Sequence, residues 1–351
     1  MWCTTIYSYS HFFNFQGLID TRCSHLTKSG VLQNFNMRLH DRLHLMRFLG
    51  RLIFLSILIL PFAGCLFLVR RTLTDHELKE ITIHGITRRY ILHVPKSYKD
   101  SSHPNLVMVL HGGGGNGRNI EQMSGFTERS DRDGFLVVYP YGTNQIFDEK
   151  FLTWNAGNCC GAALDKDIDD TTFLRQLILF VKNQYDINKV YVTGLSNGGM
   201  MTYRLACESA DIIDGIAPVS GAMNIPTCQP ARPLDVIIFH GRDDQHILYD
   251  GGQPQVKADS HERRDQSVAY AENFWRTKNQ CHDRNVTKTG NVETVSYSCD
   301  AAKISVISID DEGHTWPGGS KGYAFADPPT KEVSATDEML RFWLSKSTSD
   351  K

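Results

Sequence analysis

The chain has 351 residues, of which 41% are hydrophobic and 22% are charged. This balance excludes a wholly disordered chain and predicts a globular protein with room for one large domain or two small ones. The formal net charge is -2, and the sequence lacks the clustered Lys and Arg residues that nucleic-acid binding requires, so nucleic acid is excluded as a partner.

The N-terminal part of the chain contains an apolar run, residues 52–69, that is long enough to cross a bilayer. Arginines are more numerous before the run than after it, which favours a cytoplasmic N-terminus and an exported remainder. We predict that residues 46–71 are a signal peptide or signal-anchor helix and that residues 1–45 are a non-structural extension. The segment Phe62-Ala63-Gly64-Cys65 resembles a bacterial lipobox, so a lipidated Cys65 is a further alternative. Every alternative predicts an extracellular or periplasmic protein that meets the membrane only through this segment.

The remainder, residues 78–346, alternates short β-rich runs with amphipathic segments. This alternation predicts one α/β domain, in which a mostly parallel central sheet carries helices on both faces. An antiparallel hairpin is expected over 81–94, around His84-Gly85. Buried strands are expected at 106–110, 135–139, 190–193, 236–239 and 304–309, and helices at 170–185, 198–208, 267–279 and 335–345.

The clearest motif is VYVTGLSNGGM at 190–200, in which a predicted strand runs through Gly194-Leu195-Ser196-Asn197-Gly198 into a predicted helix. This is the G-x-S-x-G pattern of a nucleophile elbow in its strand, turn and helix setting. Glycines are needed there because a serine in so tight a turn has a strained backbone and close neighbours. We predict that Ser196 is a nucleophile.

A second motif, LVMVLHGGGGNG at 106–117, ends a predicted strand in a glycine-rich loop. Such a loop, with the amide of Asn197, would supply the backbone N–H groups of an oxyanion hole, which we assign to Gly112, Gly113 and Asn197. Gly112, Gly114 and Gly117 also satisfy G-x-G-x-x-G, with Asp131 or Asp133 as the acidic residue of a dinucleotide site. That alternative leaves the elbow unexplained, and no cofactor is implied.

The acid and the histidine of a catalytic triad should follow the serine in this order, each after a strand. The run 236–239 leads into His240-Gly241-Arg242-Asp243-Asp244, and 304–309 leads into a loop that contains His314. We predict Asp244 and His314 as the triad partners, with Asp243 as the alternative acid. His111 and His240 are expected to brace turns, whereas His246, His261 and His282 are expected to be solvated.

With these motifs the chain resembles the polyhydroxybutyrate depolymerase and feruloyl-esterase-like family of secreted esterases, over about residues 78–345. The matching stretches are HGGGGNG (111–117), WNAGNCCG (154–161), DIDDTTFLRQLI (167–178), GLSNGGMMTYRLAC (194–207), FHGRDDQHILYDGG (239–252) and EGHTWPGG (312–319). The resemblance implies an acyl-enzyme mechanism on carboxylic esters and points to Trp154, Asn155 and Trp316 as pocket-lining residues. The chain departs from the family at Arg242-Asp243-Asp244, where Thr-Ala-Asp is usual, and Asp244 keeps the family's register to Gly251-Gly252.

Six cysteines lie beyond the apolar run, and an even number in an exported protein favours disulfides. Cys281 and Cys299 are the pair we select, because they bracket a short polar stretch with Thr289-Gly290-Asn291 as its turn. Spacing typical of a zinc site is lacking, so no metal is predicted. The acidic run 165–170 could suggest calcium, but we interpret it as a charged loop that caps the next helix.

These observations together predict a serine carboxylic-ester hydrolase that acts on polyhydroxybutyrate-type, feruloyl or acetyl esters, small or polymer-linked. A serine peptidase of the same fold and a non-catalytic binding protein that keeps the fold are the alternatives. We expect a monomer. Soluble or polysaccharide-linked esters are favoured over solid polyester, because the 37 residues after His314 leave no room for an adsorption module.

Overall fold

The computed structural model describes residues 77–344, except residues 101, 145, 147–148, 258–260 and 323–325. The chain from Asp75 to Lys351 forms a compact unit of its own. The predicted extension (1–45) and the predicted signal or anchor (46–71, with the 52–69 run and Cys65) lie outside the described residues. Within the described ranges, no helix has both the length and the apolar character that crossing a membrane would need.

A ten-stranded sheet forms the centre of the described part of the chain, with the strand order β1-β2-β4-β3-β5-β6-β7-β10-β9-β8. The neighbours from β4 to β10 pair in parallel, and the strands at both edges pair antiparallel. The strands are β1 (Leu78–Ile83), β2 (Ile86–His93), β3 (Leu106–Leu110), β4 (Leu136–Pro140), β5 (Val190–Leu195), β6 (Gly215–Val219), β7 (Asp235–Gly241), β8 (Cys281–Thr289), β9 (Val292–Cys299) and β10 (Ile304–Ile309).

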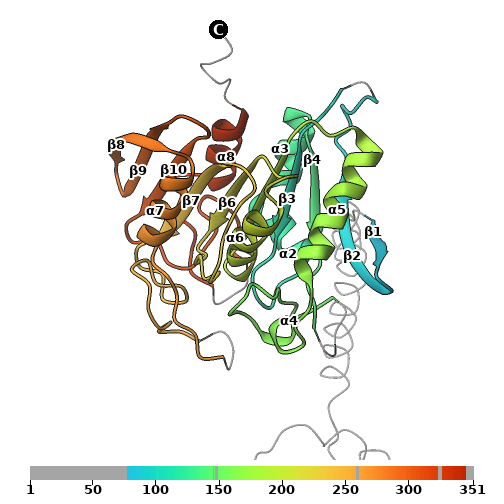
Figure 1. Ribbon diagram of the computed structural model, residues 1–351, viewed down its shortest axis with the longest axis horizontal. Helices are drawn as coiled ribbons and strands as arrows, with labels where there is room; N and C mark the ends of the chain where they lie inside the picture. Colours follow the sequence, from blue (N-terminus) through green and yellow to red (C-terminus); the bar gives the residue numbers. More distant parts are fainter. Residues whose placement is uncertain are drawn as a thin grey trace, which may run out of the picture. The chain divides into compact units, whose positions relative to one another are not determined.

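Helices cover both faces of this sheet (Figure 1). One face packs against α5 (Asp170–Tyr185), α6 (Asn197–Ser209) and α7 (Val268–Lys278), and the other against α2 (Gly117–Ser124), α3 (Phe126–Asp133) and α8 (Ala335–Leu344). A short helix, α4 (Gly161–Asp165), lies in the connection between β4 and α5. The predicted α/β-hydrolase architecture, a mostly parallel sheet between two helical layers, is confirmed.

The central strands are apolar throughout because both of their faces are covered. In β3, Leu106, Met108 and Leu110 belong to the core beneath α5, α6 and α7, whereas Val107 and Val109 belong to the core beneath α2, α3 and α8. Side chains alternate between the two faces of a strand, so a continuous apolar run of this kind fills two cores at once.

The five predicted strands are present within one or two residues of the expected bounds, and the predicted hairpin is present but begins three residues earlier, at Leu78. Strand β6 was not predicted, because Gly215-Ile-Ala-Pro-Val has few β-branched residues. Helices α2 and α3 were also missed, since their polar sequences resemble a loop. Each ends at a glycine with positive φ, Gly125 and Gly134, which stops the helix without a steric penalty.

The acidic run 165–170 leads into the N-terminus of α5 and stabilises it. Asp169 caps this helix, because its carboxylate accepts the N–H of Thr172 at 2.9 Å. Asp170 is fully buried, and it pairs with Arg88 of β2 at 2.7 Å. A cap supplied by the acidic run is therefore confirmed, although Asp169 provides it and Asp170 instead ties α5 to β2.

Candidate active site

The turn between β5 and α6 holds Ser196. β5 ends at Leu195 and α6 begins at Asn197, so Ser196 makes the turn by itself, with φ of 58° and ψ of -123°. A Cβ on Gly194 would lie 2.6 Å from the Gly198 carbonyl carbon, and a Cβ on Gly198 would lie 2.5 Å from two backbone carbonyl oxygens. The spacing of the glycines is therefore a steric requirement of the turn. Strained backbone of this kind is typical of functional sites.

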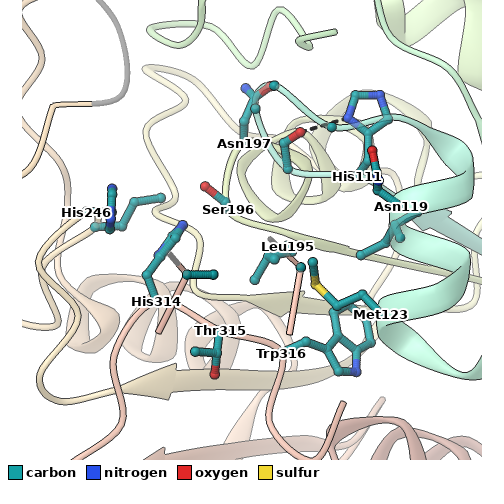
Figure 2. A pocket seen from close by; sticks show the side chains of 18 of the residues that line it. His111, Asn119, Met123, Leu195, Ser196, Asn197, His246, His314, Thr315 and Trp316 are labelled. Atoms are coloured by element: carbon teal, nitrogen blue, oxygen red, sulfur yellow. Dashed lines mark hydrogen bonds between the residues drawn. The ribbon is translucent and has the colours of Figure 1, made fainter. Parts of the chain in front are cut away.

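The glycine loop after β3 lies against this turn, since a Cβ on Gly112 would be 3.4 Å from the Cβ of Ser196. The N–H of Gly142 donates to His111 Nε2 at 3.0 Å, which makes Nε2 the acceptor. Nδ1 therefore carries the proton and donates to the Gly112 carbonyl at 2.8 Å (dashed in Figure 2). Burial lowers the pKa of His111 to about 4, in agreement with a neutral ring. His111 braces the loop, as predicted.

This brace also sets the direction of the next amide. In a trans peptide the N–H points opposite to the carbonyl, so fixing the Gly112 carbonyl toward His111 turns the Gly113 N–H the other way. Among the described residues, no backbone hydrogen bond uses that N–H. The Gly113 N–H is thus an available donor next to the elbow.

Asn197 clamps the segment that contains Trp154. The Trp154 N–H donates to Asn197 Oδ1 at 2.7 Å, and Asn197 Nδ2 donates to the Trp154 carbonyl at 3.0 Å. The Trp154 ring also donates to the His111 carbonyl at 2.9 Å. Trp154 and Asn155, expected to line the pocket, are instead buried behind its wall, because their polar groups bind backbone and side chains there. The resemblance identified the right segment but assigned it the wrong role.

Asp244 binds His314 directly. Its Oδ2 lies 2.7 Å from His314 Nδ1, and its Oδ1 accepts the N–H groups of His246 and Ile247 at 2.8 and 2.9 Å. Burial by itself would raise the pKa of Asp244, but the nearby His314 and the backbone N–H lower it to about 2. The buried carboxylate is therefore ionised, and it holds His314 with Nε2 directed away from it.

The alternative acid, Asp243, is exposed, and its backbone N–H bonds to the Glu312 carbonyl. His240 lies beneath the loop, where its Nε2 is 2.7 Å from the Ile247 carbonyl, so it braces the turn as predicted. Of the two adjacent acids, the structure therefore brings Asp244 to the histidine.

Two acids that were not predicted hold the His314 loop. The His314 N–H donates to Asp327 Oδ2 at 2.8 Å. Glu312 is buried, and it accepts the Thr330 N–H at 2.9 Å and the Thr315 hydroxyl. Burial raises the pKa of Glu312. The one sequence signal for these contacts is the position of Glu312 two residues before His314.

A cavity of about 520 Å³ opens at the elbow and is lined by Ser196, Asn197, Gly112, Gly113 and His314. Figure 2 shows the His314 imidazole on the side of Ser196 to which its hydroxyl points. Among the described hydrogen bonds, none joins the two groups, and bonds of this type tighten when substrate binds.

One wall of the cavity is apolar and lies below Ser196 in Figure 2. It is built from Leu195 of the elbow, Ile120 and Met123 of α2, and Trp316. Trp316 therefore lines the cavity as expected, and its ring N–H is bound to the Thr336 hydroxyl at 3.0 Å. Ile120 and Met123 were missed because α2 was not predicted, and Leu195 was missed because its neighbours across the cavity come from other segments.

Two polar residues that were not assigned to the site, His246 and Arg263, also line the cavity. His246 was expected to be solvated, which is wrong, because its backbone is bound to Asp244 and its half-buried ring packs against His314. His261 is also not fully solvated, since its ring lies 3.0 Å from Asp165. His282 is exposed, as predicted.

The described cysteines form the disulfides Cys207–Cys228, Cys281–Cys299 and Cys159–Cys160. The predicted Cys281–Cys299 bridge is confirmed, and it joins the ends of the β8–β9 hairpin. Cys159 and Cys160 line the cavity. In the described part of the chain, no group of three or more His, Cys, Asp or Glu side chains is arranged to hold a metal ion.

Comparison with known proteins links the chain to esterases, although no family model matches it. A protein of Nocardia uniformis subsp. tsuyamanensis, named NocK and provisionally assigned as an esterase, is 27% identical over 289 residues, which cover 76% of this chain and 82% of NocK. Feruloyl esterase B of Piromyces equi is 26% identical over 249 residues, 68% of this chain and 44% of that enzyme. The chain therefore spans less than half of the Piromyces enzyme.

Among solved structures, an acetyl xylan esterase from Aspergillus awamori superimposes with a TM-score of 0.49 at 19% identity, over 68% of this chain and 94% of that one. The family resemblance inferred from the motifs is confirmed by the sequence relatives, which carry esterase names.

Proposed function

We propose that this chain is a serine carboxylic-ester hydrolase in which Ser196 is the nucleophile, His314 the general base and Asp244 the acid that orients it. The observation that carries the proposal is the 2.7 Å contact between the buried carboxylate of Asp244 and Nδ1 of His314, whose side chain lines the same cavity as Ser196. The contact supports a catalytic triad, because it joins two of the three predicted members beside the third. The esterase names of the relatives support the same activity.

In the acylation step, His314 Nε2 takes the proton of the Ser196 hydroxyl while Oγ attacks the carbonyl carbon of the ester. The carbonyl oxygen becomes an oxyanion and accepts hydrogen bonds from backbone N–H groups of Gly112 or Gly113 and of Asn197. The C–O bond to the alcohol then breaks, and His314 returns the proton to the departing oxygen. The alcohol leaves, and the acyl group remains on Ser196.

Deacylation repeats these steps with water. His314 takes a proton from the water molecule, the resulting oxygen attacks the acyl carbon, and the bond to Ser196 breaks with return of the proton to Oγ. The products are a carboxylic acid and the original enzyme. Each oxyanion donor is expected to contribute about 3 kcal/mol to lowering the barrier, so the glycine loop matters as much as any single side chain except the triad.

We propose feruloyl, acetyl or polyhydroxybutyrate-type esters, free or linked to a polysaccharide, as the substrate class. The apolar wall of Ile120, Met123, Leu195 and Trp316 supports an apolar acyl group. Feruloyl esterase and acetylxylan esterase among the relatives support the same class. No observation favours the peptidase or the binding-protein alternative.

We also propose that the protein acts outside the cytoplasm. The disulfides in the described residues fit an oxidising compartment. We propose that the protein is attached to the membrane, if at all, either through residues 52–69 as a helix or through a lipid on Cys65. We also propose that it is a monomer.

The test is labelling of the purified protein with a fluorophosphonate probe, in parallel with hydrolysis of p-nitrophenyl acetate, methyl ferulate and a peptide amide. We expect labelling and hydrolysis of both esters, and Ser196→Ala should abolish both. Ser320→Ala is the matched control, since it removes a hydroxyl from another serine that lines the same cavity. Persistent labelling of Ser196→Ala, or hydrolysis of the amide but of neither ester, would refute the proposal.

A further inference from the structure

The proposed mechanism divides the cavity into an acyl side and an alcohol side. His314 must return its proton to the departing alcohol oxygen, so this oxygen lies next to His314 Nε2. The oxyanion lies toward the glycine loop and Asn197. The acyl group takes the remaining direction, toward Leu195, Met123 and Trp316, which Figure 2 shows on the side of Ser196 away from His246. Residues beside the His314 ring therefore meet the alcohol.

His246 is the side chain that lies beside this ring. The two ring centroids are 4.8 Å apart and the planes are tilted by 34°. Both rings line the cavity. An alcohol that leaves beside His314 is therefore within reach of the His246 imidazole.

The backbone of His246 is held on both sides. Its N–H donates to Asp244 Oδ1 at 2.8 Å, and its carbonyl accepts from Arg263 Nη2 at 2.8 Å. In contrast, the described hydrogen bonds leave both nitrogens of the His246 ring without a partner. The backbone that carries this ring is thus held by the same carboxylate that orients His314, and the ring itself lines the cavity.

Arg263, which lies in the same lining, is neutralised by an ion pair. Its side chain is 4% exposed, and its Nε lies 3.0 and 3.1 Å from the two carboxylate oxygens of Asp265. Its Nη1 lies 3.9 Å from Cys159 Sγ. Because Asp265 compensates the charge of Arg263, this part of the lining suits a neutral hydroxyl better than a carboxylate.

We propose that His246 is a specificity-determining residue for the alcohol half of the ester, and that its imidazole hydrogen-bonds to a hydroxyl of a polyhydroxylated alcohol as that alcohol leaves past His314. This inference rests on the proposed function. It assigns to the site a preference that neither the triad nor the oxyanion hole provides, since those groups contact only the reacting ester atoms.

The electrostatic surroundings support a neutral His246 ring. Burial lowers the pKa of His246, and so does the nearby charge of His314, while Asp244 and Asp327 oppose this and Arg263 adds to it. A neutral imidazole offers one donor and one acceptor, which matches the hydroxyl group of an alcohol. It also leaves the positive charge that develops during catalysis on His314.

The experiment compares esters with one acyl group and two alcohols, methyl butyrate and glycerol monobutyrate, in the wild type, His246→Phe and His246→Asn. Phenylalanine keeps an aromatic ring against His314 but removes both nitrogens, and asparagine restores a donor and an acceptor. We expect His246→Phe to lower kcat/KM for the glycerol ester about 3- to 10-fold, mainly through KM, because one neutral hydrogen bond is lost. The methyl ester should change less than about 2-fold, and His246→Asn should recover part of the difference.

His282→Phe is the control, since His282 is exposed on β8 and lies outside the cavity. Thermal unfolding of each variant shows whether it is folded. An equal loss for both esters would mean that His246 only supports His314, and no loss for either would mean that the alcohol does not touch it; both results overturn the inference. If the wild type fails to label at Ser196 with a fluorophosphonate, the proposed function itself is refuted.

Discussion

The replacement of Asp244 by asparagine tests the geometry of the site at its central contact. Asp244 Oδ1 accepts two backbone N–H groups, from His246 and Ile247, whereas Oδ2 faces His314 Nδ1. In Asp244→Asn the two backbone N–H groups will retain the amide oxygen, because an amide NH₂ cannot accept from them. The NH₂ group is then directed at His314 Nδ1.

The tautomer of His314 follows from this orientation. Facing an NH₂ donor, Nδ1 becomes an acceptor, so the proton moves to Nε2 and His314 can no longer take the proton of Ser196. In a serine protease the corresponding replacement lowers kcat by about 10,000-fold, and we expect a loss of this order for ester hydrolysis. Burst and steady-state assays with p-nitrophenyl acetate would measure it, with circular dichroism as the check on folding.

Asp243→Asn is the matched control, because it makes the same chemical change one residue earlier on an exposed side chain. It should retain activity within about 2-fold, as surface substitutions away from such networks generally have small effects. A larger loss in Asp243→Asn than in Asp244→Asn would refute the assignment of the acid and the reasoning from the contact at His314.

The remaining predictions concern stability. The pKa of Asp244 is lowered from 3.8 to about 2, so its ionised form stabilises the fold above pH 4 by about 2 kcal/mol, and this contribution should disappear as the pH falls from about 4 to about 2. Asn197→Ala leaves the buried N–H of Trp154 without a partner and removes one of the two hydrogen bonds to its carbonyl, so it should cost about 1 to 3 kcal/mol in the free energy of unfolding. Removing the Cys281–Cys299 bridge, which spans 18 positions, should cost about 3 kcal/mol without changing the activity of the folded protein. Gly198→Ala should prevent the backbone from forming the tight elbow turn and should lower the free energy of unfolding by about 1 to 3 kcal/mol or more.

Urea unfolding measures each of these changes against a control. The loss of stability between about pH 4 and pH 2 should be missing in Asp244→Asn. If the stability of the variant fell with pH in parallel with that of the wild type, the prediction would be contradicted. For Asn197→Ala, the control is the exposed Asn273→Ala, and equal losses would contradict the clamp. For Gly198→Ala, the control is Gly113→Ala, whose added Cβ would meet its nearest neighbour at 3.7 Å; equal stabilities would contradict the steric argument. An unchanged midpoint without the Cys281–Cys299 bridge would show that the hairpin does not need it.

Several errors of the sequence analysis have a common cause. His246 was expected to be solvated and Trp154 to line the pocket. In the structure His246 lines the cavity, and Trp154 is buried behind the cavity wall. Whether a polar or aromatic residue in a loop faces a cavity depends on the segments that pack against it. For Trp154 these segments are the His111 and Asn197 loops, which are more than 40 positions away along the chain.

The sequence by itself determined the features whose physics is local. A serine between two glycines at the junction of a strand and a helix can adopt only a few backbone conformations, so Ser196 and its turn follow from adjacent residues. The continuous apolar runs determined that the sheet is buried on both faces. Only the tertiary structure decided between Asp243 and Asp244, placed Met123 and Trp316 on the apolar wall of the cavity, and brought His246 against His314. These contacts join residues on different loops, and their distances are set by the order of strands in the sheet, which no short stretch of sequence contains.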